Sequence, residues 1–383
     1  MRVKLSEAFD LQMGKTPARN NSAYWGPGYK WVSIADIGGA EKYISKTKET
    51  ITDIAVSESG IKVVPRNTVI MSFKLSIGKT AITDDDMYTN EAIMAFLDKS
   101  TYKINTNYLY HLCKGIDWFK GTNKAVLGLT LNKATMSEKE IEIPPVEEQE
   151  EAVAVLDKAD DLISLRKQQL AKLDELVKAR FVELFGVCDT YELLKDSNIY
   201  ISDGNYSSKY PTADEFVEEG IPFIRASNME MNTIVDNNMY FITKEKHAIL
   251  LKGHVKAGDV LITTRGATIG KIACVPPRHE DSNINAQIVL LRCPKKEYNP
   301  LFLSWYLKLD NTQAEIQKLI SGSAQPQLPI KRLVQLNLLK PDINLQNQFA
   351  AFVEQTDKSK LAIQQSLDKL ETLKKSLMQK YFG

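Results

Sequence analysis

IPPVEEQEEAVAVLDKADDLISLRKQQLAKLDELVKARFVELFG, residues 143–186, carries the strongest secondary-structure signal in this chain of 383 residues. Two prolines, which a helix interior excludes, are followed by an uninterrupted helical pattern. Apolar residues recur at seven-residue spacing over five heptads, which is typical of a coiled-coil seam. Four glutamates lie near the start, where carboxylates interact favourably with the helix dipole. The stretch therefore predicts one long helix that packs along another helix.

The chain contains a second copy of this helix and of the region before it. At a shift of 197 positions, Gln149 matches Gln346, and the match continues to the Phe-Gly pair that ends each copy. At a shift of 192, two further segments match without a gap, residues 67–70 with 259–262 and residues 77–79 with 269–271. Such self-similarity indicates a duplicated module. We expect each copy to be a mixed α/β globular part with short strands, followed by a long helix.

We expect the two helices to pair antiparallel within the chain. Residues 143–188 hold 6 basic and 10 acidic side chains, whereas residues 338–383 hold 7 and 5. This complementarity supports pairing only weakly, since each exposed ion pair contributes at most ~1 kcal/mol. The expected seam consists of Leu156, Ile163, Leu170, Leu173, Val177 and Leu184 in the first helix and Val353, Ile363, Leu367, Leu370 and Leu377 in the second. The alternative is a lone amphipathic helix that lies on its own domain.

Composition excludes several classes of protein. The chain is 43% apolar and 25% charged, the ordinary mix of a soluble globular protein. It contains no apolar run of the ~18–20 residues that a membrane span needs. Its four cysteines are far apart and form no C-x-x-C pair, which favours reduced thiols and a cytoplasmic location. The net charge is only +1, so binding to nucleic acid must depend on where the charges lie.

The sequence lacks the motifs of common enzymes. Residues 14–16 and 78–80, both Gly-Lys-Thr, resemble the end of a phosphate-binding loop, but Phe9 and Phe73 occupy the position of its first glycine. No G-x-G-x-x-G follows a strand to seat a nucleotide or S-adenosylmethionine, and no G-x-S-x-G marks a serine nucleophile. The histidines and cysteines lack the spacing of zinc ligands. The sequence therefore predicts no catalytic site, no metal and no cofactor bound by this chain.

Several short segments occur in a characteristic order along the chain. They are GKTP at 14–17, IPP at 143–145 ahead of EQ at 148–149, LRKQQL at 165–170, FVELFG at 181–186, IPFIR at 221–225, GDVLI at 258–262, RGATIGK at 265–271 and SAQPQL at 323–328. This ordered set resembles the specificity subunit of type I restriction–modification systems. The resemblance extends over essentially the whole chain and agrees with the repeat that self-comparison finds.

The resemblance implies two tandem target recognition domains, residues 1–142 and 189–337, separated by helical spacers at residues 143–188 and 338–383. The spacers would form an antiparallel intramolecular coiled coil with pseudo-twofold symmetry. Each domain would read one half of a split, asymmetric site in double-stranded DNA. Two modification subunits would dock on the helices and use S-adenosylmethionine for methyl transfer, and restriction subunits would add a nuclease that uses ATP and Mg. The chain itself would be a non-catalytic cytoplasmic subunit that does not contact a membrane.

The predicted helix has a suitable length for this role. From Glu147 to Leu184 it contains 38 residues and spans about 57 Å at ~1.5 Å per residue. That length holds two readers more than one turn of B-DNA apart, a turn being ~34–36 Å. A flexible linker would let the spacing vary, so a rigid helix suits the function better.

Resemblance and side-chain chemistry together suggest the DNA-contacting residues. Arginine and lysine pair with guanine, asparagine and glutamine pair with adenine, and glycine lets a loop approach phosphate closely. The candidates are Lys15, Trp25, Tyr29, Lys74, Ser76, Lys79, Tyr206, Lys209, Arg225, Arg265, Thr268, Lys271, Gln325 and Gln327. For the loop lysines, the alternative is an ordinary strand turn with a solvated side chain. For the two glutamines, it is structural capping before the second long helix.

The sequence leaves two other functions open. The first is a self-contained methyltransferase or nuclease, which the missing motifs oppose. The second is a coiled-coil scaffold that binds only proteins. Within the leading interpretation, the chain could also serve a related methylation or phage-defence complex that lacks a restriction subunit.

Overall fold

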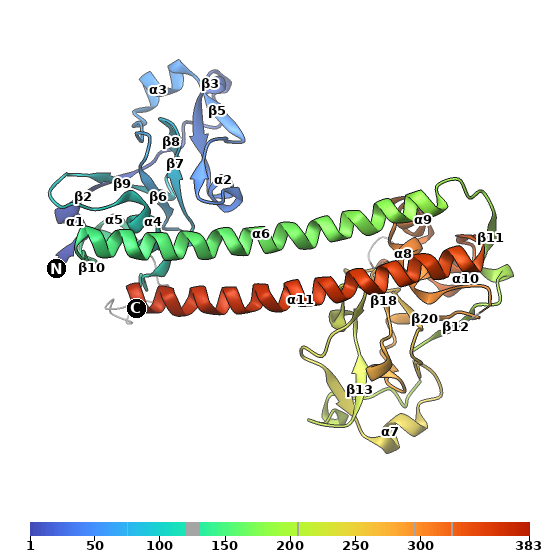
Figure 1. The fold of residues 1–383 in the computed structure, drawn as a ribbon. Helices are drawn as coiled ribbons and strands as arrows, with labels where there is room; N and C mark the ends of the chain where they lie inside the picture. Colours follow the sequence, from blue (N-terminus) through green and yellow to red (C-terminus); the bar gives the residue numbers. More distant parts are fainter. Residues whose placement is uncertain (75, 120–130, 205–206, 295, 323–324) are drawn as a thin grey trace. The chain divides into compact units, whose positions relative to one another are not determined.

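The computed structural model describes residues 1–383 with the exception of 75, 120–130, 205–206, 295 and 323–324. The chain divides into two compact units, of which unit 1 contains residues 1–168 and 364–383 and unit 2 contains residues 169–363. Both units mix strands with helices, and each receives a part of each of two 40-residue helices (Figure 1). The predicted mixed α/β fold with two long helices is confirmed.

Unit 1 is built on a five-stranded sheet and a three-stranded sheet. The strand order of the first is β2 (Phe9–Met13), β9 (Ile93–Asp98), β6 (Val69–Ser72), β7 (Thr80–Thr83) and β4 (Tyr43–Ile44). The order of the second is β5 (Glu49–Ile51), β3 (Trp25–Val32) and β8 (Tyr88–Thr89). A separate antiparallel pair joins β1 (Arg2–Lys4) to β10 (Glu140–Glu142) and thus brings both ends of the globular part together.

Unit 2 repeats this plan. Its four-stranded sheet has the order β12 (Tyr200–Asp203), β20 (Ile288–Arg292), β17 (Val260–Thr263) and β18 (Ile272–Cys274). Its three-stranded sheet has the order β16 (Tyr240–Ile242), β13 (Ile221–Ile224) and β19 (Asn283–Ile284). Two further antiparallel pairs are β11 (Tyr191–Leu193) with β21 (Asn337–Leu339) and β14 (Met229–Glu230) with β15 (Thr233–Ile234). The shared topology is what a duplicated module predicts.

The structure corrects one detail of the repeat. β6 ends at Ser72 and β17 ends at Thr263. The Ser72 hydroxyl accepts a hydrogen bond from the Lys79 amide, and the Thr263 hydroxyl accepts one from the Lys271 amide. Ser72 and Thr263 are therefore equivalent, and the two strands correspond at a shift of 191. The ungapped match of residues 67–70 with 259–262 is therefore wrong by one position within the strand. Every residue of both strands is buried, so the hydrophobic pattern does not distinguish the two alignments.

Short helices cover the sheets of each unit. In unit 1 they are α1 (Leu5–Ala8), α2 (Ile34–Gly39), α3 (Asp53–Ser59), α4 (Thr106–Gly115) and α5 (Lys133–Ser137). In unit 2 they are α7 (Lys244–Ile249), α8 (Pro300–Lys308), α9 (Asp310–Leu319) and α10 (Ile330–Leu333). Asn105 caps α4 and Asn299 caps α8, each through a side-chain oxygen that accepts from backbone amides of the first turn.

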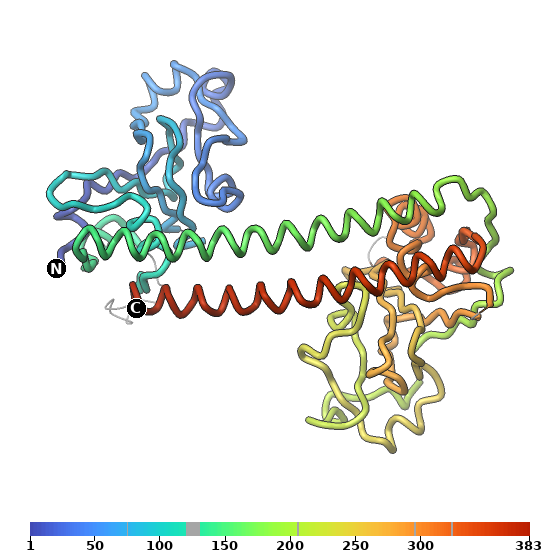
Figure 2. The backbone as a smooth tube through the Cα atoms, viewed as in Figure 1, coloured from blue at the N-terminus to red at the C-terminus, as the bar shows by residue number. Residues whose placement is uncertain are grey.

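The long helices are α6 (Val146–Phe185) and α11 (Ile343–Phe382), and they run antiparallel in both units. In unit 1, Lys374 of α11 pairs with Asp160 of α6. In unit 2, Lys360 of α11 pairs with Asp174 of α6, with 2.6 Å between the ammonium and the carboxylate. Figure 2 shows the two helices as continuous tubes of opposite direction.

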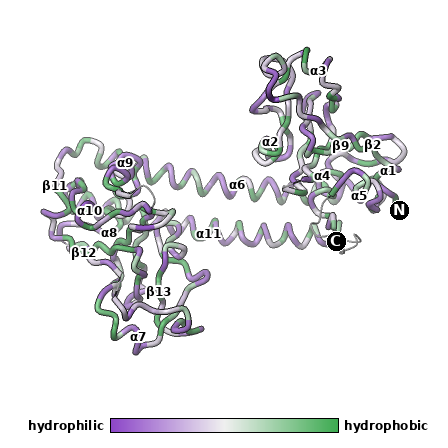
Figure 3. The backbone as a smooth tube through the Cα atoms, turned by 180° about the vertical axis from the view of Figure 1, so that it is seen from behind, coloured by the Kyte–Doolittle hydropathy of each residue, from purple (hydrophilic) through white to green (hydrophobic). Residues whose placement is uncertain are grey.

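Burial along these helices follows the heptads. Of the expected seam residues, Leu156, Val177, Val353 and Leu367 are buried. The others are half-buried, and they are Ile163, Leu170, Leu173, Leu184, Ile363, Leu370 and Leu377. Hydrophilic and hydrophobic residues alternate along both helices (Figure 3). This pattern is typical of a two-helix pair in which one face of each helix stays open to solvent.

One buried glutamine joins the globular part of each unit to its long helix. Gln149 Nε2 donates to the carbonyls of Lys103 and Pro144, both at 2.9 Å, and its Oε1 accepts from the Asn105 amide. Gln346 has the same three partners in unit 2, the carbonyls of Glu297 and Pro341 and the amide of Asn299. Both side chains are fully buried. The helix start is therefore fixed to α4 or α8 by a satisfied polar network.

Among the residues that the structure describes, none belongs to a helix with the length and apolarity required to cross a membrane.

Candidate nucleic-acid interface

The glycine-flanked loop of each unit is closed by the same polar turn. In unit 1, Lys79 N donates to Ser72 Oγ at 3.2 Å, Gly78 N donates to the Ser72 carbonyl, and Ser72 Oγ donates to the Ser76 carbonyl. In unit 2, Thr263 takes the place of Ser72 and makes the three corresponding hydrogen bonds with Lys271, Gly270 and Thr268. The hydroxyl that ends the strand thus shapes both loops. Sequence reasoning missed these two hydroxyls, although a Ser or Thr before a Gly-Lys turn is a readable signal.

A glycine is required at the same point of each loop. Gly78 and Gly270 both have φ 87°, in the left-handed region that favours glycine. The two loops differ in length by one residue, because three residues separate the hydroxyl of Ser72 from Ser76 and four separate Thr263 from Thr268. The difference lies at the loop tips, where two readers of different sequences are expected to diverge.

Each loop carries a lysine directly after this glycine, and Lys271 is half-buried whereas Lys79 is exposed. Lys271 Nζ donates to the Ala226 carbonyl at 3.1 Å. The Lys79 ammonium lies next to Gly38, in space that a larger residue at position 38 would occupy. Gly38 lies near the last residue of α2, which follows β3. Ala226 is the first residue of a 3-10 turn, Ala226–Asn228, which follows β13. The Lys271 hydrogen bond helps to hold the unit 2 loop in place.

The exposed tip of the unit 2 loop lies beside a second loop that carries the two candidate glutamines. Arg265 forms an isolated β-bridge with Gln327, and Leu328 N donates to the Thr264 carbonyl at 2.9 Å. Arg265, Thr268 and Gln325 are exposed, and Gln327 is half-buried. We call these four residues the unit 2 tip. The structure therefore brings together four candidates that are up to 62 positions apart in the sequence.

The unit 1 tip has fewer described residues. Lys74 and Ser76 are exposed, and Lys74 Nζ lies 5.3 Å from the centroid of the Phe73 ring. The segment that corresponds to the glutamine loop of unit 2 falls in residues 120–130, outside the described residues.

A second candidate surface of unit 1 contains Lys15, Trp25 and Tyr29. The Trp25 indole donates to the Ala18 carbonyl at 3.2 Å, and the Tyr29 hydroxyl donates to Asp53 at 2.8 Å. Tyr29 is 43% exposed and Lys15 is exposed, whereas Trp25 is half-buried. The Tyr29 ring is held rigidly at the surface, so it offers a flat face without further loss of side-chain entropy.

Arg19 is a residue of this surface that sequence reasoning missed. Its guanidinium lies 3.9 Å from the Trp25 ring and 4.9 Å from the Trp31 ring, and it donates to both carboxylate oxygens of Glu49. Hydrogen bonding to Arg19 lowers the pKa of the Glu49 carboxyl. No local pattern places Glu49 beside Arg19, since the contact depends on how β3 pairs with β5.

The remaining candidates of unit 2 do not form one cluster. Lys209 is exposed. Arg225 donates to the Asn238 carbonyl at 2.7 Å and stacks on Tyr240, 3.4 Å from the ring centroid, so it acts within the fold. Tyr206 lies outside the described residues.

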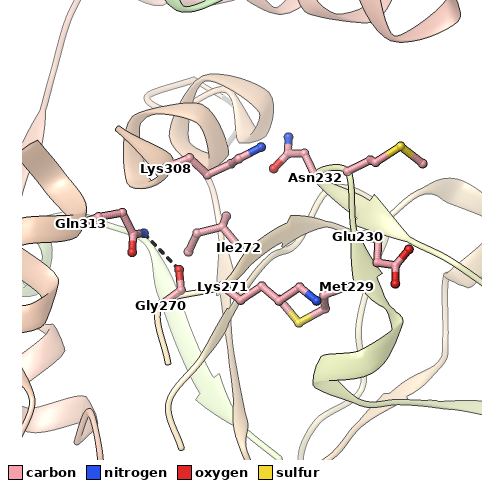
Figure 4. Close-up of a pocket in the computed structure, with 9 residues that line it drawn as sticks. Met229, Glu230, Asn232, Gly270, Lys271, Ile272, Lys308 and Gln313 are labelled. Carbon is pink, nitrogen blue, oxygen red and sulfur yellow. Dashed lines mark hydrogen bonds between the residues drawn. The ribbon is translucent and has the colours of Figure 1, made fainter. Parts of the chain in front are cut away.

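A cavity of about 300 Å³ lies behind the unit 2 loop (Figure 4). Gln313 of α9 donates to the Gly270 carbonyl at 3.0 Å, as the dashed line in Figure 4 shows. Lys308 and Asn232 line the same cavity, and burial lowers the pKa of Lys308. Asn232 Nδ2 donates to Ser304 of α8 at 3.0 Å. The Gln313 contact attaches the base of the loop to α9, and the Asn232 contact attaches the turn between β14 and β15 to α8.

The described residues contain no group of three or more His, Cys, Asp or Glu side chains that could hold a metal ion. Burial raises the pKa of the Cys274 and Cys293 thiols to about 12. Burial also raises the pKa of Cys113 strongly. These three thiols are therefore protonated near neutral pH and are poor nucleophiles.

Sequence comparison relates this chain to known proteins over most of its length. The model described as "Type I restriction modification DNA specificity domain" matches residues 1–175 and 201–374. The MjaIX specificity subunit of Methanocaldococcus jannaschii is 29% identical over 186 residues, which is 48% of this chain and 42% of that protein. The MjaVIII specificity subunit of the same organism is 22% identical over 399 aligned residues, 98% of this chain and 90% of that protein.

Comparison with solved structures supports the fold. The S subunit of a type I restriction–modification system from M. genitalium has a TM-score of 0.59 at 15% identity, covering 100% of this chain and 96% of that one. The family model matches both copies of the module, and the duplicated topology with two long helices agrees with the solved fold. The chain belongs to the family of type I restriction–modification specificity subunits.

Proposed function

We propose that this chain reads a split, asymmetric DNA site, one half with each globular part. In this proposal residues 1–142 and 189–337 are the target recognition domains, and residues 143–188 and 338–383 are the spacers. One observation carries the proposal: the same polar turn presents a different tip in each unit, and the same buried glutamine fixes each unit to a long helix.

The unit 2 tip has the chemistry for reading bases. Arg265 can donate two hydrogen bonds to guanine, and Gln325 and Gln327 can each donate to and accept from adenine. In unit 1, the exposed Lys15 and Lys74 suit contacts with phosphate, which fix orientation rather than sequence. Lys271 supports the unit 2 loop from within, and the exposed Lys79 remains a candidate for contact with DNA. We therefore assign base reading to the unit 2 tip, on a frame held by internal hydrogen bonds.

The long helices suit the role of a spacer. Each contains 40 residues, which correspond to about 60 Å at ~1.5 Å per residue. A satisfied hydrogen-bond network at Gln149 and Gln346 fixes the helix starts rigidly to the globular parts. Rigid ends and a rigid helix together would keep the interval between the two half-sites constant.

Chemistry would come from partner subunits. Two modification subunits docked on the exposed faces of the helices would bind S-adenosylmethionine, and restriction subunits would bind ATP and Mg. A net charge of +1 gives this chain little general attraction for DNA, so we expect the partners to neutralise much of the phosphate charge. The four cysteines are free thiols, which favours a cytoplasmic location.

The test is methylome sequencing of cells that carry this chain with its modification subunit. We expect one motif made of two defined half-sites around an unspecified interval. Replacing only residues 1–142 with the corresponding segment of another family member should change one half-site and leave the other half-site and the interval unchanged. A matched replacement of residues 189–337 should change only the other half-site.

Three results would contradict the proposal. A continuous motif without an interval would exclude two separate readers. Binding of the assembled complex to random DNA as tightly as to the methylated site would favour a scaffold that binds only proteins. Methylation by the purified chain alone would instead indicate a self-contained enzyme.

A further inference from the structure

The second seam row of α11 contains two lysines among its apolar residues. The row consists of Val353, Lys360, Leu367, Lys374 and Tyr381 at seven-residue intervals. The Lys360 and Lys374 side chains are only 14% and 20% exposed. Partial burial of an ammonium group costs free energy that a leucine at the same position would not cost. The lysines therefore need an explanation other than stability.

Each lysine pairs with an aspartate on α6 inside its own unit. Lys374 pairs with Asp160 in unit 1, and Lys360 pairs with Asp174 in unit 2. The lysines are fourteen residues apart on α11, and the aspartates are fourteen residues apart on α6 in the opposite order. Both pairs therefore correspond to one and the same antiparallel register of the two helices.

The heptad-spaced aliphatic residues alone do not specify this register. Because they repeat every seven residues, sliding α11 by one heptad along α6 would again place apolar rows against each other. Such a slip moves the helix by about 10 Å at ~1.5 Å per residue. That displacement equals about three base pairs of B-DNA at ~3.4 Å each.

The charged residues do distinguish the registers. A slip of one heptad in one direction would place Lys374 opposite Lys167 and Lys360 opposite Phe181. A slip in the other direction would place Lys360 opposite Lys167. In the observed register Lys167 instead pairs with Glu371 at 3.1 Å. Either slip thus replaces attraction by repulsion between two ammonium groups.

The surroundings of the two pairs contain further charged and aromatic side chains. Asp160, Lys167, Glu371 and Lys374 line one groove of about 520 Å³ in unit 1, which is open to solvent. In unit 2, Lys360 also lies 5.3 Å from the Trp305 ring and 3.7 Å from Asp357. The pairs are therefore partly open to solvent and ordered enough to discriminate between registers.

We propose that the Lys360–Asp174 and Lys374–Asp160 pairs fix the axial register of α6 and α11 and thereby determine the interval between the two DNA half-sites. This proposal rests on the proposed function, since it assigns the interval to particular residues. The Phe181–Phe349 contact, with ring centroids 5.3 Å apart, also opposes a slip. Because the Phe181–Phe349 contact remains, loss of the ion pairs should add a secondary interval only as a minor product beside the main one.

The first test uses the double variant Lys360→Met/Lys374→Met in the complex with the modification subunit. Methylome sequencing should show the wild-type motif plus motifs whose interval is about three base pairs longer or shorter. Preference for the main interval should fall by up to about fivefold, the ratio that corresponds to one exposed charge pair of ~1 kcal/mol. The melting temperature should stay the same or rise, because methionine suits a seam position.

The second test keeps the lysines and changes the residue that repels them. Lys167→Glu would attract Lys374 or Lys360 in a slipped register and would repel Glu371 in the observed one, so it should also produce a secondary interval. Lys158→Glu is the matched control, because it makes the same charge change at an exposed position of α6. The control should leave the interval unchanged.

A readout without DNA separates this proposal from the proposed function. In the full chain, the pair Leu170→Cys/Ile363→Cys should form a disulfide in the observed register, and Leu170→Cys/Leu370→Cys should form one only after a slip. Adding Lys360→Met/Lys374→Met should raise the yield of the second crosslink several-fold. An unchanged crosslink pattern together with a single interval in both variants would refute the register proposal. A wild-type chain without any two-part motif would refute the proposed function, and the crosslinks would still decide the register.

Discussion

The two units attach the same globular fold to the same long helices with different chemistry. In unit 2, Phe181, Phe185 and Phe349 pack around Phe302 of α8, with ring centroids 4.8 to 5.7 Å apart. In unit 1, the corresponding place holds Tyr108 against Phe382, 5.4 Å apart. In unit 1, Ala152 occupies the position equivalent to Phe349 of unit 2, and Met378 occupies the position equivalent to Phe181.

Unit 1 contains a polar network where unit 2 is aromatic. His111 is buried, and its Nε2 lies 2.6 Å from Asp157, which also accepts two hydrogen bonds from Lys42 at 2.7 Å. Trp305 of α8 occupies in unit 2 the position that His111 of α4 occupies in unit 1. The shared glutamine fixes the geometry of the attachment, while the groups that fill the remaining volume differ. The joint that attaches a globular part to the long helices therefore requires filled volume and satisfied polar groups. Aromatic packing in unit 2 and a polar network in unit 1 both meet this requirement.

The largest effect should come from removing the ring that unit 1 lacks. Phe349→Ala converts the unit 2 position to the residue of unit 1, but without the compensating polar network. We expect a loss of about 3–5 kcal/mol in the free energy of unfolding, because Phe349 is fully buried in an aromatic cluster. Denaturant unfolding followed by hydrogen exchange should show that unit 2 opens before unit 1.

The control for this prediction is Leu361→Ala on the same helix. Leu361 is 60% exposed, so its truncation should change stability by less than about 0.5 kcal/mol. If Phe349→Ala cost no more than this control, the aromatic cluster would not be what holds unit 2 to the long helices.

The next effect should separate the two tips. Arg265→Ala should cost about 1–3 kcal/mol of discrimination at one position of one half-site, because it removes a bidentate contact with a base. The other half-site should be unaffected. Methylome sequencing of the variant measures both at once, and Gln325→Ala offers a second test on the same tip. Equal loss at both half-sites would show that Arg265 contacts phosphate or stabilises the fold instead.

The polar joint should make unit 1 sensitive to pH. Burial lowers the pKa of His111, although the hydrogen bond with Asp157 acts in the opposite direction. As the pH falls through about 6.5, the unfolded chain binds a proton that the folded chain takes up less readily, so stability falls by at most about 1.4 kcal/mol per pH unit. Above that pH the effect is absent. Thermal unfolding between about pH 5 and about pH 8 measures it.

The matched variant is His111→Gln, which removes the titrating group and keeps a hydrogen-bond donor for Asp157. Its melting temperature should depend less on pH than that of the wild type. A residual dependence should remain, because burial also lowers the pKa of His279 in unit 2. An unchanged pH profile would mean that His111 titrates equally in the folded and unfolded chain.

These comparisons show why the sequence predicts the helices and the repeat but not the joints. Heptads and matched segments are local patterns that depend on spacing alone, so α6, α11 and the duplicated topology follow from them. The partners of Gln149 lie 44 to 46 positions upstream and at Pro144, and nothing near Gln149 in the sequence marks them. The aromatic and ionic joints are likewise contacts between distant segments, so they appear only once the sheets are assembled.

The tips show the same division. The Gly-Lys turns are visible in the sequence because glycine at a positive φ has a strong preference. The direction of the two lysines is not visible, since it depends on the carbonyl of Ala226 and on the space beside Gly38. A one-residue difference in loop length also escapes sequence matching, because both strands before the loops are buried at every position.

The smallest effect should come from phosphate contacts, which both units are expected to make alike. Lys74→Ala in unit 1 and Lys209→Ala in unit 2 each remove one exposed ammonium group. Each should weaken binding of the assembled complex uniformly across sequences and reduce the slope of log affinity against log salt by about 1. Titrations of labelled DNA at several salt concentrations measure this slope. A changed half-site motif in either variant would move that lysine from phosphate to base contacts, whereas an unchanged slope would place it away from the DNA. Equal slopes for the two variants would show that the units differ in how they are joined to the helices and in what they read, but not in how they hold the DNA backbone.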